Sequence, residues 1–266
     1  MSFSIDGKTA IVTGAANGIG LAIARHFASQ GANVMFADMD DTRLSEELGE
    51  VEDDSKIRYF SGDLREKLTT ANLLSGTIDA FDSVDILVNG SRQMLTTSPL
   101  DAEDDTVSTL LQQNLMTSLR LSQLVARRMI KQAKDRETNS VGSIINLSSI
   151  AARRARPELL AYSISTAALD QMTRSLAVAF APERIRVNAV AFGSVMSASL
   201  KETLRGNSDY RETIEGKTPL GRIAAPSELA EAVQYLASDA SGFVTGQVLT
   251  VDGGRTLLDP VEAPAH

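Results

Sequence analysis

The chain of 266 residues contains no cysteine, no tryptophan and only two histidines. The absence of cysteine excludes disulfide bridges, thiolate metal sites and a cysteine nucleophile. Histidine-based catalysis and metal binding are not expected either, and no metal site is predicted. One histidine, His26, lies in an expected helix beside Phe27, where a structural role is the simpler interpretation. The chemistry must therefore come from hydroxyl, amide, carboxylate or guanidinium groups, or from a bound cofactor.

An excess of basic residues and long apolar runs are also lacking. Lys and Arg number 26 against 34 Asp and Glu, and the net charge is -8, which offers no electrostatic footprint for nucleic acid or an anionic membrane. No apolar run is long enough to span a membrane and no signal-peptide pattern opens the chain, so a cytoplasmic location is expected. The length and the 43% hydrophobic content suit one globular domain over residues 1–266.

The hydrophobic pattern alternates apolar strands with amphipathic helices. Strands are expected at 9–12, 32–38, 56–60, 85–89, 142–147, 185–191 and 247–251. A helix is expected after the first strand, and others at 42–48, 68–81, 102–131, 159–180 and 227–236. This order predicts a doubly wound α/β fold, with one parallel sheet of about seven strands and helices on both faces. The segment 193–219 is expected to be irregular and to form a lid over a substrate.

The turn between the first strand and the first helix contains three glycines, Gly14, Gly18 and Gly20, with Asn17 and Ile19 beside them. Glycine allows a tight turn and a close approach of a ligand, and a helix start offers unpaired N–H groups at its positive end. A turn that needs glycine for steric reasons alone is the alternative. We expect these five residues to hold the pyrophosphate of a dinucleotide.

Asp38 ends the second strand eighteen residues after Gly20. Dinucleotide folds place an acid there to hydrogen-bond the adenosine ribose hydroxyls. A 2′-phosphate would face like charge, and neither Lys nor Arg stands at Ala15, Ala16 or Met39 to compensate. The sequence therefore predicts NAD as the cofactor and rejection of NADP, although a solvated strand end would look the same.

Two hydroxyl side chains follow the fifth strand. Ser149 closes that strand, and Tyr162 opens a long helix thirteen residues later, so both can meet above one sheet edge. A phenol can exchange a proton with a substrate oxygen while a serine hydroxyl holds the same oxygen in place. Beside a dinucleotide loop, this pair predicts hydride transfer that interconverts a secondary alcohol and a ketone.

Further motifs occur in order along the chain. They are Asp63-Leu64, Asn89, Asn114, the stretch Ile-Arg-Val-Asn-Ala-Val at 185–190 and Val-Asp-Gly-Gly at 251–254. With the glycine turn, Ser149 and Tyr162, they make the chain resemble the short-chain dehydrogenase/reductase family over roughly residues 5–257, which implies a Rossmann fold.

The resemblance also implies roles for individual residues. Asp63 and Leu64 would flank the adenine, Asn89 would line the cofactor channel, and Gly193 would border the nicotinamide. Asn114, Ser149 and Tyr162 would occupy the catalytic positions of the family. Family members tend to be tetramers built through their fourth and fifth helices. A homotetramer is therefore expected, and a mixed tetramer with an active homologue is the alternative.

Three segments depart from the family pattern. Thr166 stands four residues after Tyr162, where the family has a lysine that is thought to bind the nicotinamide ribose and to depress the tyrosine pKa. Threonine could keep a ribose hydrogen bond but carries no charge. Arg92 replaces the glycine of the family's Asn-Asn-Ala-Gly, and Phe192 replaces the proline of its Pro-Gly. A backbone with positive φ would strain Arg92, so we expect this loop to have changed shape.

These departures leave three interpretations open. In the first, the enzyme is active on a small-molecule substrate, and Arg92 or one of Arg153, Arg154 and Arg156 substitutes for the lysine; for the last three, a solvated loop is the alternative. In the second, the chain is a catalytically impaired subunit that binds cofactor or scaffolds an active partner. In the third, it is a nucleotide-sensing regulator that needs no hydroxyl pair. We favour the first, with the substrate left open.

Overall fold

The computed structural model describes residues 2–49, 55–134 and 140–259, and within them the strands form one sheet in the order β3-β2-β1-β4-β5-β6-β7. The strands are β1 (Thr9–Thr13), β2 (Asn33–Asp38), β3 (Ile57–Ser61), β4 (Ile86–Asn89), β5 (Gly142–Ser149), β6 (Ile185–Phe192) and β7 (Val248–Val251). Every neighbouring pair is parallel. After β3 the chain returns to the other side of β1, so the strand order reverses between β1 and β4. Ligands of such sheets bind at this reversal, beyond the carboxyl ends of the strands.

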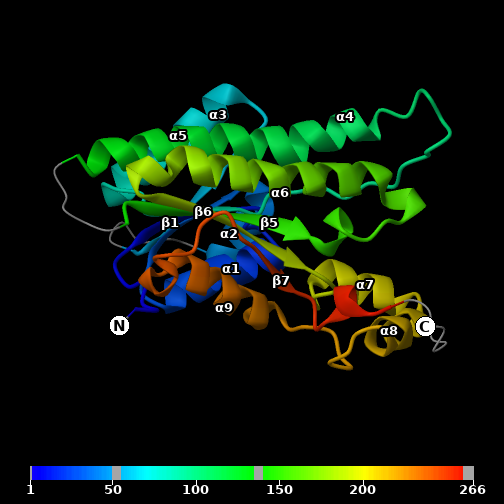
Figure 1. Cartoon of the computed structure of the whole chain (residues 1–266). Coiled ribbons are helices and arrows are strands. Elements are labelled where there is room, and N and C mark those ends of the chain that lie inside the picture. Colours follow the sequence, from blue (N-terminus) through cyan, green and yellow to red (C-terminus); the bar gives the residue numbers. More distant parts are fainter. Residues whose placement is uncertain (1, 50–54, 135–139, 260–266) are drawn as a thin grey trace.

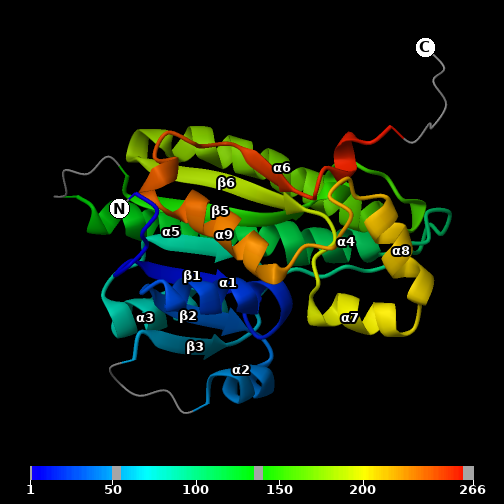
Figure 2. The same cartoon turned by 90° about the horizontal axis from the view of Figure 1, so that it is seen from below.

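Helices cover both faces of the sheet, as the doubly wound prediction requires (Figures 1 and 2). One face carries α1 (Gly18–Ser29), α2 (Asp41–Leu48) and α9 (Pro226–Ala237), whose side chains Phe27, Leu44 and Val233 belong to one buried cluster. The other face carries α3 (Lys67–Phe81), α5 (Thr117–Gln132) and α6 (Leu160–Phe180). All residues of β1 and β6 are buried, because a parallel sheet between two helical layers has no solvated face. The predicted fold class is confirmed.

Two predicted segments differ from the structure. The helix expected at 102–131 begins as α4 (Thr106–Leu110), passes through a π-helical turn, η1 (Leu111–Met116), and continues as α5. The prediction that 193–219 is irregular was wrong, because it contains α7 (Ala198–Arg205) and α8 (Ser208–Gly216). Ser197 caps α7 by accepting a hydrogen bond from the Leu200 amide at 3.2 Å. The sequence did not predict these two helices because neither contains a long stripe of apolar residues. Both lie beyond the carboxyl ends of the strands (Figure 2).

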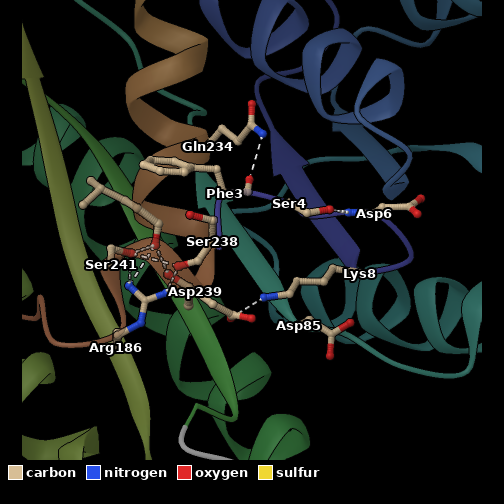
Figure 3. Close-up of polar contacts among 12 residues, drawn as sticks. Phe3, Ser4, Asp6, Lys8, Asp85, Arg186, Gln234, Ser238, Asp239 and Ser241 are labelled. Atoms are coloured by element: carbon tan, nitrogen blue, oxygen red, sulfur yellow. Dashed lines mark hydrogen bonds and ion pairs between the residues drawn. The ribbon is translucent and has the colours of Figure 1, made fainter. Parts of the chain in front are cut away.

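The opposite, amino edge of the sheet is held by a buried arginine. The Arg186 guanidinium in β6 donates hydrogen bonds to the carbonyls of Leu236 (2.9 Å) and Ser238 (3.1 Å) and to the Ser241 hydroxyl (2.6 Å), as Figure 3 shows from β6 toward α9. Burial lowers the pKa of Arg186. A charge is tolerated here because three oxygens replace its water. These bonds fix the end of α9 on the sheet.

Replacing Arg186 by methionine should destabilise the fold by about 1–3 kcal/mol, because the buried oxygens lose a charged donor, although the two carbonyls keep hydroxyl donors from Ser143 and Ser241. Urea unfolding followed by circular dichroism measures this loss. Arg174→Met is the control, since Arg174 is an exposed arginine of α6. We expect the control to change stability by less than about 0.5 kcal/mol. Equal losses for the two variants would contradict a special role of the buried guanidinium.

In the described ranges, no helix is long and apolar enough to cross a membrane. The same residues contain no cluster of three or more His, Asp or Glu side chains that could hold a metal ion. His26 bridges two helices instead, with its Nε2 atom 2.6 Å from Oε1 of Gln234 in α9.

Candidate functional site

The glycine turn between β1 and α1 leaves no room for a side chain at Gly14 or Gly20. A Cβ atom at Gly20 would lie 2.0 Å from the Gly14 carbonyl oxygen, and one at Gly14 would lie 2.8 Å from the Gly90 carbonyl carbon. Gly14 and Gly18 also have positive φ angles, +71° and +56°. The turn therefore packs its backbone directly on the loop after β4.

The start of α1 presents free donors to the same place. In the described structure the side chain of Asn17, the residue before the helix, makes no capping hydrogen bond. The first intrahelical bond is donated by the Leu21 amide to the Asn17 carbonyl at 3.2 Å. The amides of Gly18, Ile19 and Gly20 therefore precede the helical ladder, at the positive end of the helix dipole. A backbone cradle of this kind fits the diphosphate of a dinucleotide.

Asp38, at the carboxyl end of β2, is bonded to this turn. Its Oδ2 accepts a hydrogen bond from the Ala16 amide at 3.0 Å, and its Oδ1 accepts from the amides of Met39 and Asp40 at 2.8 and 3.2 Å. A carboxylate has about four lone-pair sites, so one stays available to a ribose hydroxyl. The contact with Ala16 fixes the acid beside the cradle.

Asp63 and Leu64 follow β3 on the same edge. The Arg65 guanidinium donates from Nε to both carboxylate oxygens of Asp63 at 2.9 Å, and this lowers the pKa of Asp63. Leu64 is buried in the cluster under α3 and α5. Their contact with an adenine remains a prediction.

The segments that carry Ser149 and Tyr162 meet at one short turn, η2 (Ile150–Ala152). The Ser149 hydroxyl, at the end of β5, accepts a hydrogen bond from the Ala151 amide at 3.1 Å. The Tyr162 side chain, in the first turn of α6 and 5% exposed, belongs to a buried cluster with Leu110 and Ala161, against which Ala151 packs. Ala151 thus joins the two hydroxyl-bearing segments at the carboxyl edge of the sheet.

Asn114 reaches the same helical turn from η1. Its amide donates to the Ser165 hydroxyl at 3.1 Å, and Ser165 donates to the Tyr162 carbonyl at 2.9 Å. Thr166, 3% exposed, donates its proton to the carbonyls of Tyr162 (2.9 Å) and Ser163 (3.1 Å). Because the Thr166 hydroxyl donates to the helix backbone, the ribose hydrogen bond expected from the sequence would be one in which the Thr166 oxygen accepts.

Asn89 is buried at the end of β4 and belongs to a polar network. Its amide donates to the Ser122 hydroxyl at 3.0 Å and to the Asn146 side-chain oxygen at 2.8 Å, and Asn146 donates to the Thr173 hydroxyl at 2.8 Å. This network joins β4, β5, α5 and α6 beneath the carboxyl edge. It fixes the ends of the strands, whether or not Asn89 also lines a cofactor channel.

The loop after β4 is held on both sides of Arg92. The Thr13 hydroxyl accepts from the amides of Gly90 and Ser91 at 3.0 and 3.1 Å. Asn114 clamps Gln93, accepting from its amide at 2.8 Å and donating to its carbonyl at 2.9 Å. Sequence reasoning missed both anchors, because the partners are far apart in the chain and no local pattern marks them.

Arg92 does not have the positive φ angle that would strain its backbone. Among the described residues, positive φ angles outside glycine occur only at Asp82 and Arg184. The Arg92 side chain extends over the strand ends, with its guanidinium carbon 4.2 Å from the centre of the Phe192 ring and its Nη1 atom 3.5 Å from the Ser148 carbonyl. The two departures Arg92 and Phe192 are thus in contact, across the end of β5.

The other three candidate arginines have partners elsewhere. Arg153 donates to the Thr250 hydroxyl at 2.9 Å, and Arg154 donates to the Thr256 carbonyl. Arg156 pairs with Glu158 at 2.5 Å. These contacts favour the solvated-loop interpretation of this group.

Gly193 follows β6 and donates its amide to the Val251 carbonyl at 3.2 Å. A Cβ atom at Gly193 would lie 3.2 Å from the Asp252 Cβ, so glycine allows β6 and β7 to end close together. Its proximity to a nicotinamide remains a prediction.

A buried carboxyl that the sequence analysis overlooked lies behind these strand ends. Asp170 is 4% exposed and accepts a hydrogen bond from the Ser148 hydroxyl at 2.6 Å. Burial raises the pKa of Asp170, and the Ser148 hydrogen bond opposes this rise. The sequence could have pointed to this residue, because Asp170 follows Tyr162 by eight residues in one helix, about two turns later and on the same side.

Comparison with known proteins extends this picture. Residues 14–256 match the family model described as enoyl-(acyl carrier protein) reductase. An uncharacterised oxidoreductase of Mycobacterium tuberculosis is 35% identical, over 96% of this chain and 94% of its own. Cis-4-hydroxycyclohexanecarboxylate dehydrogenase of Sinomonas cyclohexanicum is 34% identical, over 94% and 97%.

A solved structure is similar as well. The 7α-hydroxysteroid dehydrogenase complexed with NADH and 7-oxo glycochenodeoxycholic acid is 30% identical, covers 95% of this chain and 96% of its own, and superposes with a TM-score of 0.86. The family match and these relatives show an oxidoreductase of the dehydrogenase/reductase class. The chain therefore belongs to the short-chain dehydrogenase/reductase family.

Proposed function

We propose that the protein is an NAD(H)-dependent oxidoreductase that interconverts a secondary alcohol and a ketone. One observation carries the proposal: the backbone cradle, bonded to Asp38, lies on the same sheet edge as the joined Ser149 and Tyr162 segments. The similar 7α-hydroxysteroid dehydrogenase is complexed with NADH and a 7-oxo compound, and the Sinomonas relative is named for a hydroxy compound. Both names support this class of chemistry.

The chain's own residues have separate tasks in this proposal. The cofactor supplies or accepts the hydride. The amides of Gly18, Ile19 and Gly20 hold its diphosphate, and Asp38 accepts hydrogen bonds from its adenosine ribose. The Tyr162 phenol gives a proton to the substrate oxygen or removes it, while the Ser149 hydroxyl holds that oxygen in place.

The segment 193–219 can still act as a lid over the substrate, although it contains two helices. A Cβ atom at Gly18 would meet the Ser197 Cβ at 4.0 Å, which brings the start of α7 to the cradle. At its base, Val195 pairs with Ala224, so the two ends of the segment are held together. We propose that α7 and α8 move over a bound substrate as one element.

The alternative function is a catalytically impaired subunit that binds cofactor or scaffolds an active homologue. Thr166 supports it, because this uncharged side chain stands one helical turn after Tyr162 and donates its hydroxyl hydrogen bond to the helix backbone. We further propose a cytoplasmic homotetramer, in which the fourth and fifth long helices, α4–α5 and α6, form the contact. The mixed tetramer belongs to the alternative function. Sedimentation of the purified protein, alone and with a homologue, separates the two assemblies.

Thr166→Lys separates activity from impairment. We expect the variant to raise turnover in the oxidative direction at neutral pH by about tenfold, because a nearby ammonium favours the ionised phenol of Tyr162. The initial rate of NADH formation from a secondary alcohol measures this. Thr166→Met is the control, since it adds length without charge. An unchanged rate would support the impaired subunit, because a pocket that has lost its function gains nothing from the lysine. A lower rate would show that another cation already favours the ionised phenol.

The function itself is tested by purified protein, NADH and a panel of ketones. We expect NADH to bind, as measured by calorimetric titration, and at least one ketone to be reduced at a rate proportional to protein concentration. Binding of NADH without any turnover supports the impaired subunit. Absence of NADH binding overturns the proposed oxidoreductase.

A further inference from the structure

Most hydrogen-bond donors of Arg92 have no acceptor in the described part of the protein. A guanidinium has five N–H donors. Within the described residues, the Ser148 carbonyl at 3.5 Å is the single acceptor recorded for Arg92, and no carboxylate forms an ion pair with it. The residue is exposed, and its contacts with the Ser148 carbonyl and the Phe192 ring place the guanidinium at the carboxyl edge of the sheet. Its remaining donors are available to a ligand there.

The guanidinium also has a packing partner. Its carbon lies 4.2 Å from the centre of the Phe192 ring, a cation–π contact that restricts the motion of the group. The backbone on either side is tied down by Thr13 through Ser91 and by Asn114 through Gln93. A fork of parallel donors that is fixed before binding loses little entropy when an acceptor arrives.

The position of this fork relates it to the substrate. Arg92 starts from the loop after β4 and crosses the end of β5 toward Phe192 at the end of β6. Ser149 ends the same β5 strand, one residue after the carbonyl that Arg92 approaches. A group bound by Arg92 would therefore lie close to Ser149, at the sheet edge where the proposed reaction takes place.

The chemistry of a planar fork selects its partner. Guanidinium groups bind carboxylates through two parallel hydrogen bonds, and these charge-assisted bonds are about twice as strong as neutral ones. We propose that Arg92 binds a carboxylate of the substrate, so that the enzyme acts on keto acids and hydroxy acids in preference to neutral ketones and alcohols. This inference rests on the proposed function and names its substrate class.

Matched pairs of ketones test it. The probes are 4-oxocyclohexanecarboxylate and levulinate, each against its uncharged primary amide, with NADH as reductant. We expect the wild type to prefer at least one acid over its amide by about tenfold or more in kcat/KM. Arg92→Gln should abolish that preference, because it should raise KM for the acid about tenfold more than KM for the amide, whatever its effect on kcat. Arg156→Gln is the control, because that arginine pairs with Glu158, and it should keep the preference.

Several results would overturn the carboxylate site while leaving the proposed function intact. One is equal use of acid and amide by the active wild type, and another is an acid preference that survives Arg92→Gln. A third is tighter NADH binding by Arg92→Gly, which would mean that the side chain occupies space that the cofactor needs. If NADH does not bind at all, the proposed function fails, and direct calorimetric titration of levulinate into wild type and Arg92→Gln still decides whether Arg92 holds an anion.

Discussion

Replacing Tyr162 by phenylalanine should lower kcat for NADH-linked ketone reduction by about 10²–10⁴-fold, the usual contribution of a general acid. The change removes only the phenol oxygen. The ring stays packed with Leu110 and Ala161, so the start of α6 keeps its place and the fold keeps its stability. The cradle residues are unchanged, and the Kd for NADH should therefore stay within about twofold. Stopped-flow or steady-state rates measure kcat, and calorimetric titration measures the Kd.

Tyr235→Phe is the matched control, because Tyr235 lies on α9, on the opposite face of the sheet, with its ring 6.1 Å from that of Phe3. It should leave kcat unchanged. Full turnover in the Tyr162 variant would remove the phenol from the proposed mechanism. Loss of turnover together with loss of NADH binding would instead point to a damaged fold, which circular dichroism detects.

The strands and the glycine turn were predictable because their causes are local. β1 and β6 are buried along their whole length and rich in apolar residues, although β6 also contains Arg186 and Asn188. The positive φ angles of Gly14 and Gly18 explain why glycine stands there. The predicted acid Asp38 does contact the glycine turn, through Ala16. The hydrophobic pattern and the residue spacing were therefore enough to predict the architecture and the position of the cradle.

The rest depended on contacts between distant residues. The Asn114 clamp on Gln93 spans 21 residues, and the Thr13 contact with Ser91 spans 78. Both departures at Arg92 and Phe192 are visible in the sequence, but their stacking is a tertiary contact that no periodicity encodes. α7 and α8 escaped prediction for a different reason, because short exposed helices depend on capping rather than on an apolar stripe.

Selection of the cofactor should depend on Asp38. We expect NADH to bind about 100-fold more tightly than NADPH, because a 2′-phosphate beside a carboxylate costs several kcal/mol and 1.4 kcal/mol corresponds to tenfold in affinity. Asp38→Asn removes the charge and keeps the shape. The variant should bring the two affinities to within about tenfold, chiefly by improving NADPH binding. Paired calorimetric titrations of wild type and variant with both cofactors measure the two ratios.

The size of the side chain matters in this experiment because Asp38 also holds the turn. Its two oxygens accept from the amides of Ala16, Met39 and Asp40, so alanine would loosen the cradle and weaken both cofactors together. Asparagine keeps one acceptor and separates charge from structure. The matched control is Asp40→Asn, a neighbouring acid whose side chain accepts from the Arg43 amide at the start of α2 and should leave the ratio unchanged. Equal binding of NADH and NADPH by the wild type would show that Asp38 does not select the cofactor, and the proposed NAD dependence would then be wrong even if the oxidoreductase activity stands.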